Sequence, residues 1–595
     1  MYCKHLLALI SIASIFVFPG YALGVQAEQI ENLGVRYPNL YLASEKIASL
    51  TYPKEITSEK TLLEEIRLLA DRKAREEYGS INNLKLTQLA EKLELANRIL
   101  IREFKFKGNT VLSDKQLLEV LQNVVGQQIE STEVFALADR ITNYYNEQGY
   151  TTSFAAIFPQ KLEEGVVTID ITEGRLEDID VEVEGWLRPK YVRERFIKIL
   201  GTLEETVYNQ KKLNEAVQLL LQDENVEKLV LEQDFEEISR NTSLKVKVIP
   251  TKRFGITLRT DNGRSPSVGS VNRIAVIKAR PSPLGDRLIV GYLNTDGSDG
   301  IDLFYGVPVN ARNGEFFLAY SQNNSQVIEI PFRVNDIDFD SDLYLIGYRQ
   351  PLIETPNTEL AVGVLGSRIS SDSTIENRAF QLVRGSDETG NLTVSTISFF
   401  QEYSNRWRNN FFSARSSMNF GVDAFDATNT GEIDGQFFSW RGLSQYVNFL
   451  APDTLSIAKL ALQLTPNDLP SPEQISLGGR ETVRGYRQSQ VVGDNGVFAS
   501  VEMWLPMWRD EDLDMALQMA PFFDFGHGWN NDRTLEKDNT LFSVGVGLQY
   551  RIKDRFRDRF IIRLDYGIPI VRIESNVVEP TLQDDGFYFL VEFNY

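Results

Sequence analysis

The chain has 595 residues and a formal net charge of −21, with 83 acidic residues against 62 lysines and arginines. This length accommodates several domains, and the negative charge excludes nucleic acid as a partner because its phosphates would be repelled. The chain holds one cysteine, Cys3, and two histidines, His5 and His527. These counts argue against a zinc site and a cysteine nucleophile, and no GxSxG turn or phosphate-binding glycine loop is present. The sequence therefore predicts no enzyme, no metal site and no cofactor.

Residues 1–27 have the pattern of a signal peptide for export. Lys4 precedes an apolar stretch from Leu6 to Phe18, and small residues then lead to a cleavage site after Ala27, with Ala22 as a second candidate. The alternative is an uncleaved membrane anchor, but the apolar stretch is short for a membrane span. We therefore expect the chain to be exported and Cys3 to be removed with the signal peptide.

Residues 28–98 are predicted to be a helical N-terminal segment. Thr61 and Glu64 form a capping box before a helical stretch that Gly79 ends. A second helix has one apolar face, made by Leu86, Leu89, Ala90, Leu93 and Ala96. The two faces pack either on each other or on a neighbouring part of the chain, and the sequence leaves both open.

Two similar α+β units follow, at residues 99–174 and 175–250. The first reads as a strand ending near Gly108, helices over 113–124 and 131–147, and strands over 151–160 and 165–174. The second repeats this order, with a strand up to Gly185, helices over 191–200 and 209–222, and strands over 226–233 and 243–250. The two glycines lie 77 residues apart, so the pattern predicts a two-copy array.

From residue 251 to 595 the pattern changes to short strands with alternating apolar residues, separated by polar turns. Clear examples cover residues 541–552 and 559–570. The region is long for one soluble sandwich and has room for about sixteen strands at some 20 residues each. No segment after the signal peptide has an uninterrupted apolar run that would span a membrane as a helix. An exported chain of this kind is either soluble or a membrane β-barrel, and the length favours the barrel.

The last nine residues, FYFLVEFNY, predict the closing strand of that barrel. Phe587, Phe589, Val591, Phe593 and Tyr595 alternate on one apolar face. In water such a strand is prone to aggregation, whereas in a bilayer this face contacts lipid. The alternative is an ordinary terminal strand of a soluble sandwich.

Two polar clusters stand out within the strand-rich region. The segment GGRETVRGYRQ contains Arg484 and reads as a loop, and PFFDFGHGW contains Asp524 and reads as a strand. An isolated arginine in a loop is usually solvated, and an isolated aspartate near a strand end usually belongs to a turn. Inside a barrel a buried charge needs a partner, which favours a specific Arg484–Asp524 pair.

These residues resemble the two signature motifs of a known family. The loop motif is Val483, Arg484, Gly485 and Tyr486, and the strand motif is Phe522, Asp524 and Gly526. They are similar to the motifs of the two-partner secretion transporters, the haemolysin secretion/activation family of the ShlB/FhaC/HecB type, which belongs to the BamA-like outer-membrane superfamily. The two α+β units resemble the POTRA domains of that family. The resemblance covers about residues 99–595.

The resemblance implies an outer-membrane barrel of 16 antiparallel strands at residues 251–595, preceded by two POTRA domains in the periplasm of a Gram-negative-type bacterium. It implies that the pore translocates a large secreted partner protein without ATP and that the lumenal Arg484 pairs with Asp524. It further implies that the partner adds a strand to the edge of the first POTRA domain. If the second strand of the unit is that edge, as in the family fold, its candidate residues are Thr152, Phe154, Ala156 and Phe158. The alternative is that this strand only completes the unit.

The resemblance also implies that Phe593 and Tyr595 form a C-terminal signal for the barrel-assembly machinery, and that the barrel contacts outer-membrane lipid. One departure concerns the helical segment 28–98, which has little proline, whereas many family members open with a plug helix and a Pro-rich linker. A plug at this segment is therefore left open. The alternative functions are an outer-membrane protein insertion factor and a passive porin. Two periplasmic units rather than a longer array favour secretion over the insertion factor, and these units together with the predicted lumenal loop argue against the porin.

Overall fold

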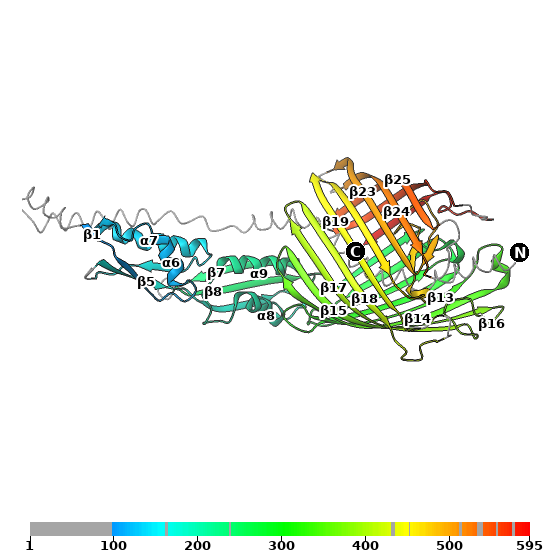
Figure 1. The fold of residues 1–595 in the computed structure, drawn as a ribbon, viewed down its shortest axis with the longest axis horizontal. Helices are drawn as coiled ribbons and strands as arrows, with labels where there is room; N and C mark the ends of the chain where they lie inside the picture. The colour runs from blue at the N-terminus through cyan, green and yellow to red at the C-terminus, as the bar shows by residue number, and fades with distance from the viewer. Residues whose placement is uncertain are drawn as a thin grey trace, which may run out of the picture. The chain divides into compact units, whose positions relative to one another are not determined.

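The structure of the protein is a computed structural model, shown in Figure 1. It describes residues 98–595 except 161–164, 237–239, 430–432, 434, 452, 511–514, 532–538, 555–556 and 574–577. The signal peptide and nearly all of the helical segment lie outside the described residues, and the domain boundaries stay a prediction. The described residues form two compact units, one of residues 98–185 and 189–250 and one of residues 186–188 and 251–595.

The smaller unit begins with a repeat of five strands and two helices, in which three of the strands form the main sheet. Its elements are β1 (Arg98–Leu100), β2 (Glu103–Lys107), α6 (Asp114–Leu121), β3 (Gln128–Glu130), α7 (Ser131–Glu147), β4 (Phe154–Ala156) and β5 (Val166–Thr172). The sheet order is β2-β5-β4, with β2 parallel and β4 antiparallel to the central β5, while β1 pairs with β3. Side chains from both helices and the sheet form one core, which includes Leu117, Ile141, Tyr145 and Val167.

Local chemistry sets the boundaries of these elements. Ser113 caps α6, and Gln116 returns the hydrogen bond to the cap backbone. Gly108 ends β2 with φ of +89°, and a Cβ there would lie 2.2 Å from the carbonyl oxygen of Ile171. The strand predicted over 151–160 is correct in place but shorter, because the backbone N–H of Ser153 bonds to the carbonyl of Tyr150 in a turn.

The second repeat has the same strand arrangement. It comprises β6 (Leu176–Val183), α8 (Pro189–Leu200), α9 (Gln210–Gln222), β7 (Val226–Phe235) and β8 (Thr242–Pro250). The sheet order is β6-β8-β7, again with the last strand in the centre and parallel to the first. Asn209 caps α9, and its side-chain amide also donates to the carbonyl of Gln148 at 3.2 Å, which connects the two repeats.

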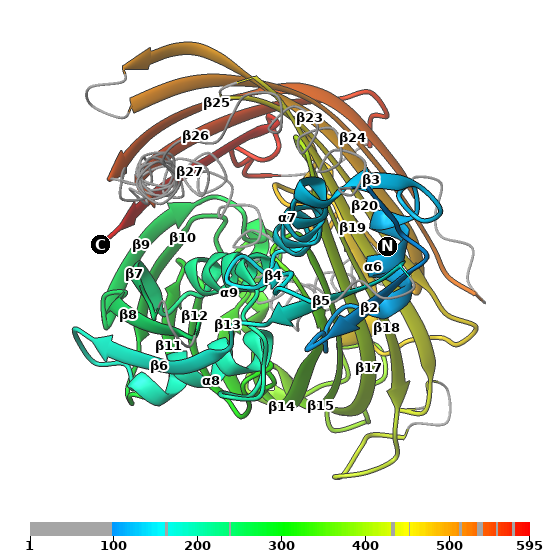
Figure 2. The same ribbon diagram turned by 90° about the vertical axis from the view of Figure 1, so that its left-hand side faces the viewer.

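The larger unit is a closed antiparallel barrel of sixteen strands (Figure 2). This confirms the barrel and the strand number. The wall strands are β9 (Phe254–Asp261), β10 (Asn272–Ala279), β11 (Arg287–Asn294), β12 (Ser298–Pro308), β13 (Glu315–Gln326), β14 (Ile337–Glu354), β15 (Thr358–Ile375), β17 (Asn391–Trp407), β18 (Asn410–Gly421), β19 (Phe438–Ala451), β20 (Thr454–Leu464), β23 (Asn495–Asp510), β24 (Met515–Trp529), β25 (Thr540–Asp554), β26 (Arg557–Pro569) and β27 (Phe587–Asn594).

Shorter elements occupy the connections between wall strands. These are η2 (Pro266–Val268), η3 (Phe332–Asn335), β16 (Arg378–Ala379), η4 (Ser471–Glu473), β21 (Ile475–Leu477) and β22 (Val491–Gly493). The predicted closing strand is β27, which pairs with β26 on one side and with β9 on the other. Its pairing with β9 closes the barrel.

Successive side chains of each wall strand point alternately to the outside and to the lumen of the barrel. On β24, Phe523 points outward and is 42 % exposed, while Phe522, Asp524 and Gly526 face inward and the aspartate is fully buried. On β27, Tyr588 and Leu590 are buried inside, whereas Phe587 is exposed. An apolar outer face with a polar interior is the pattern of a membrane barrel.

Within the described residues, no helix has the length and apolarity needed to cross a membrane.

Candidate functional site

The connection between β20 and β23, residues 465–494, folds back into the barrel, and we call it the lumenal loop. Its strands β21 and β22 pair as a hairpin, with Leu477 opposite Val491. Gly478 and Gly479 turn the chain at the hairpin end with φ of +106° and +97°. The tip of the lumenal loop contacts inward-facing side chains of β23 to β27, which places it in the lumen.

At the tip, Arg484 binds Asp524 of β24 in a forked arrangement. Arg484 Nε lies 2.8 Å from Asp524 Oδ2, and Nη2 lies 2.9 Å from Oδ1. The backbone N–H of Arg484 donates to the same carboxylate at 3.1 Å, as does the hydroxyl of Ser500 at 2.6 Å. Two parallel charge-assisted hydrogen bonds fix both the position and the orientation of the guanidinium.

The pair belongs to a larger buried group of charges on the barrel wall. Arg484 also bonds to Glu502 of β23 and lies 3.6 Å from Asp565 of β26. Arg563 bonds to Glu502 at 2.8 Å and to Asp565 at 2.8 Å. Two arginines therefore share three carboxylates, and Arg484 supplies the one cation of this group that comes from the loop.

Packing adds to these electrostatic contacts. The Arg484 guanidinium lies over the ring of Phe522, 3.4 Å from its centre. Burial disfavours the charged guanidinium, but hydrogen bonds with Asp524 and the charges of Glu502 and Asp524 outweigh it, so the pKa of Arg484 lies above its ordinary value. The arginine is charged in its buried position.

The other motif residues position the arginine. Val483 is fully buried against Gly526, where an added Cβ would lie 2.8 Å from Val483 Cγ2. Gly485 has φ of +93° and passes close to Gly567 of β26, where a Cβ would lie 2.5 Å from the Gly485 nitrogen. The hydroxyl of Tyr486 accepts the N–H of Phe542 at 3.0 Å and reaches the carbonyl oxygen of Val571 at 2.7 Å.

The closing strand also holds the loop, a contact that the sequence reasoning missed. The hydroxyl of Tyr588 on β27 bonds to the carbonyl oxygen of Tyr486 and accepts the N–H of Gly485 at 3.1 Å. Tyr588 is 1 % exposed. Its position on the inward face of the terminal strand was the available signal, but the sequence does not show which loop this face meets.

Further ion pairs anchor the rest of the lumenal loop. Arg487 lies 2.6 Å from Glu329, between β13 and β14, and 3.1 Å from Asp584, between β26 and β27. At the other end, Arg384 joins Asp494 at 2.8 Å and Asp468 at 3.1 Å. The loop is thus fastened to connections on several sides of the barrel.

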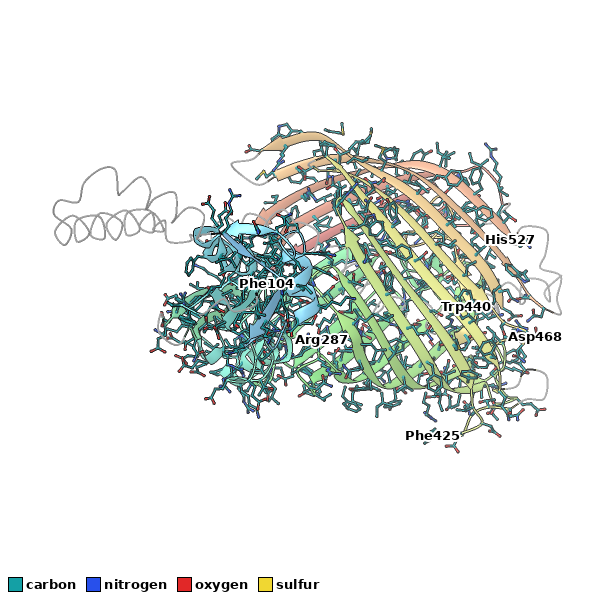
Figure 3. The ribbon with its side chains drawn as sticks, turned by 60° about the vertical axis from the view of Figure 1, so that its left-hand side comes forward. Phe104, Arg287, Phe425, Trp440, Asp468 and His527 are labelled. Atoms are coloured by element: carbon teal, nitrogen blue, oxygen red, sulfur yellow. The ribbon has the colours of Figure 1, made fainter. Side chains whose placement is uncertain are left out.

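His527, labelled in Figure 3, takes no part in this group. Its Nδ1 lies 2.8 Å from the Thr540 hydroxyl, and its ring stacks on Trp529 with the centres 5.7 Å apart. In the described part of the chain, no three His, Cys, Asp or Glu side chains are arranged to hold a metal ion.

Comparison with known proteins gives this arrangement a family. The profile of the haemolysin secretion/activation protein ShlB/FhaC/HecB matches residues 241–550, and the profile of the ShlB-type POTRA domain matches residues 99–174. The chain belongs to the ShlB/FhaC/HecB family. Members translocate partner exoproteins, and the chain is an outer-membrane transporter with its POTRA region in the periplasm.

Individual relatives and solved structures resemble this chain in sequence and in fold. The heme/hemopexin transporter protein HuxB of Haemophilus influenzae is 23 % identical over 494 residues, covering 74 % of this chain and 79 % of the relative. The outer membrane transporter CdiB of Dickeya dadantii is 22 % identical over 510 residues, covering 80 % and 85 %. The structure of CdiB from Escherichia coli matches with a TM-score of 0.68 at 18 % identity, covering 98 % of this chain and 99 % of that one. BamA from Haemophilus ducreyi lacking POTRA domains 1–3 matches with a TM-score of 0.51 at 15 % identity, covering 83 % and 100 %.

The predicted partner-binding edge of this family member lies on β4. In the sheet order β2-β5-β4 this strand is at an edge. Thr152, Phe154 and Ala156 are half-buried on one face, and Phe158 beyond the strand is 60 % exposed. Arg240 of the second repeat lies over the ring of Phe154 at 4.5 Å. Their role in binding stays a prediction.

A helix side chain occupies part of this edge. The backbone N–H of Ala155 donates to the hydroxyl of Thr142 on α7 at 2.9 Å. Beyond β4, the side-chain amide of Gln160 exchanges two hydrogen bonds of 2.8 Å with the backbone of Thr168. Thr142 therefore satisfies an edge group that a strand added along β4 would otherwise use, while Gln160 bonds to the central strand β5.

The predicted C-terminal signal lies at the barrel seam. Phe593 is opposite Phe560 on β26 and Leu258 on β9. Tyr595 exchanges backbone hydrogen bonds of 2.8 and 3.1 Å with Ile256, and its ring is 68 % exposed. The structure thus places both residues at the seam, and recognition by assembly machinery stays a prediction.

Proposed function

We propose that the Arg484 group is a latch that holds the lumenal loop inside the pore at rest, and that passage of the partner requires this loop to rearrange. The observation that carries the proposal is the buried fork between Arg484 and Asp524, in which one loop residue completes a charge group on the wall. A secretion pore needs a resting seal and a way to release it. The ion pairs of Arg487 and Arg384 support the same loop position.

In this proposal the chain acts by binding and passage rather than by catalysis. The partner is a large exported protein, the outer face contacts outer-membrane lipid, and the barrel-assembly machinery inserts the chain. A passive porin needs no latched loop. An insertion factor is distinguished by its effect on other barrels rather than on one secreted partner.

Loss of the latch is tested by recording Arg484→Ala in planar bilayers. The change leaves Asp524, Glu502 and Asp565 with one cation between them, and breaking a buried pair costs about 3–5 kcal/mol. We expect normal barrel levels in cells and a much longer time at the open conductance level, because the loop is no longer held in the lumen. Arg378→Ala, which removes an exposed arginine on β16, is the control. An unchanged open time for Arg484→Ala at normal barrel levels would refute the latch.

We further propose that the partner adds a strand along β4 and displaces the Thr142 hydroxyl from the Ala155 N–H. Thr142→Ala removes this competing acceptor and suits a helix. In the purified full-length protein, the variant should bind the partner several-fold more tightly. Phe158→Asp, which changes an exposed side chain, should weaken binding at unchanged stability. Unaltered affinity in both variants would exclude this edge as the binding site.

A further inference from the structure

A groove lies on the outer face of the barrel, over β15 and β17 to β20 and away from the lumenal loop. Its volume is about 420 Å³. Small residues form its floor, including Ala414, Ser416, Gly442 and Ser444, while Tyr403 and Trp440 stand beside them. Figure 3 labels Trp440 on the barrel wall. Small side chains allow the backbone of another molecule to approach closely.

The pairing register assigns the groove to the lipid side. Gln401 on β17 is opposite Ser416 on β18, which is opposite Gly442 on β19. The residues two places away from Gln401 on its strand, Phe399 and Tyr403, are 52 % and 40 % exposed. The next residue, Glu402, faces the lumen, where it pairs with Arg349 and Arg415. Gln401 therefore points away from the lumen.

Gln401 also lies at mid-depth of the apolar band. Trp407, at the end of β17, marks one boundary, and Ile397 lies four residues from Gln401 on the other side. A strand rises about 3.4 Å per residue and is tilted by about 40° from the membrane normal. Measured along the membrane normal, Gln401 therefore lies about 15 Å from Trp407 and about 10 Å from Ile397. Together these distances fill the band of about 25 Å that faces hydrocarbon.

The side-chain amide of Gln401 has no hydrogen-bond partner at this depth among the described residues. The nearby Ser416 hydroxyl is engaged by Trp440 Nε1 at 3.0 Å. Lipid tails offer no hydrogen bonds, so an amide in hydrocarbon is unfavourable until a polar group meets it at the same depth.

We propose that this groove is the contact surface of a dimer with a second copy of the chain. All copies insert in one orientation, so a two-fold axis along the membrane normal places each residue at the depth of its own equivalent. A primary amide both donates and accepts, which lets two Gln401 side chains satisfy each other. The small floor residues let the two walls approach. In a second copy of the chain, symmetry alone places a polar group at the depth of Gln401. A different protein would need a polar residue at that depth by coincidence.

Cysteine cross-linking in outer-membrane vesicles tests the dimer. Ser416→Cys, in a Cys3→Ser background, keeps Gln401 and places a thiol beside it. Val546→Cys on β25, an outward position among apolar neighbours, is the matched control. With copper phenanthroline or a short membrane-permeant bis-maleimide, we expect a product of twice the chain's mass from Ser416→Cys and at least fivefold less from Val546→Cys.

Adding Gln401→Leu to Ser416→Cys separates the amide contact from chance collision. The added substitution should lower the cross-linked fraction several-fold while the heat-modifiable barrel remains. Equal cross-linking at positions 416 and 546 would overturn the proposal. So would an undiminished product with Gln401→Leu, or a product whose mass shows a different protein.

Discussion

Tyr588→Phe removes one hydroxyl from the closing strand and leaves its ring in place. That hydroxyl bonds to the carbonyl oxygen of Tyr486 and to the N–H of Gly485. Each buried hydrogen bond contributes about 1 kcal/mol net, so the docked lumenal loop should lose about 2 kcal/mol relative to the undocked loop. Since 1.4 kcal/mol is a factor of ten, the undocked fraction should rise about 30-fold.

Single-channel recording in planar bilayers measures this fraction as the time spent at the open conductance level. Tyr566→Phe on β26 is the control, because Tyr566 faces outward, where it lies beside Phe587. We expect a large rise in open time for Tyr588→Phe and none for Tyr566→Phe, with heat-modifiable mobility retained in both. Equal open times for Tyr588→Phe and the unmodified chain would refute the role of the closing strand in holding the loop.

Three further changes test separate parts of the account. Gly567→Ala should increase open time even more, because its Cβ would lie 2.5 Å from the Gly485 nitrogen; unchanged recordings would contradict the close approach. Removal of Tyr595 deletes the backbone pair with Ile256 and should reduce the membrane-inserted, heat-modifiable barrel; normal insertion would limit this residue to a structural role. Burial and the hydrogen bond to Glu173 raise the pKa of Tyr145. The neutral phenol therefore stabilises the folded state fully below about pH 10, and this contribution to the free energy of unfolding is lost as the pH rises further. Tyr145→Phe should reduce this alkaline loss in thermal unfolding of the full chain, and an identical pH profile would exclude the tyrosine as its source.

The architecture was predictable because its signals are periodic and local. Alternation along β24 to β27 indicates one apolar face per strand, and the repeated glycines 108 and 185 mark two α+β units. Helix caps such as Ser113 are also local signals. These patterns depend on neighbours within a few residues, which a single sequence displays.

The complete charge group around Arg484 was not predictable in the same way. Arg484 and Asp524 stood out as unusual polar residues, but Glu502, Arg563 and Tyr588 occur in ordinary alternating strands. Their convergence depends on barrel closure and on the pairing register of strands far apart in the chain. A shift of one residue in any strand would reverse its faces and remove its side chain from the group.

The periplasmic edge shows a second limit. Thr142 lies on α7 and reads as an ordinary helix residue, yet its hydroxyl occupies the N–H of Ala155 on β4. The contact depends on how the helix packs beside the sheet edge. Sequence spacing alone does not indicate whether an edge group is free.

The central claim is that the lumenal loop must leave its docked position for the partner to pass. Val483→Cys with Gly526→Cys brings two thiols together, because a Cβ added at position 526 would lie 2.8 Å from Val483 Cγ2, a position that the sulfur of the introduced cysteine can take. The most direct measurement is partner released into the medium by this variant before and after reduction. Secretion should be blocked in the oxidised pair and restored by reductant, while secretion by each single-cysteine variant should not change on reduction. Secretion at the normal rate through an oxidised, cross-linked barrel would contradict the claim.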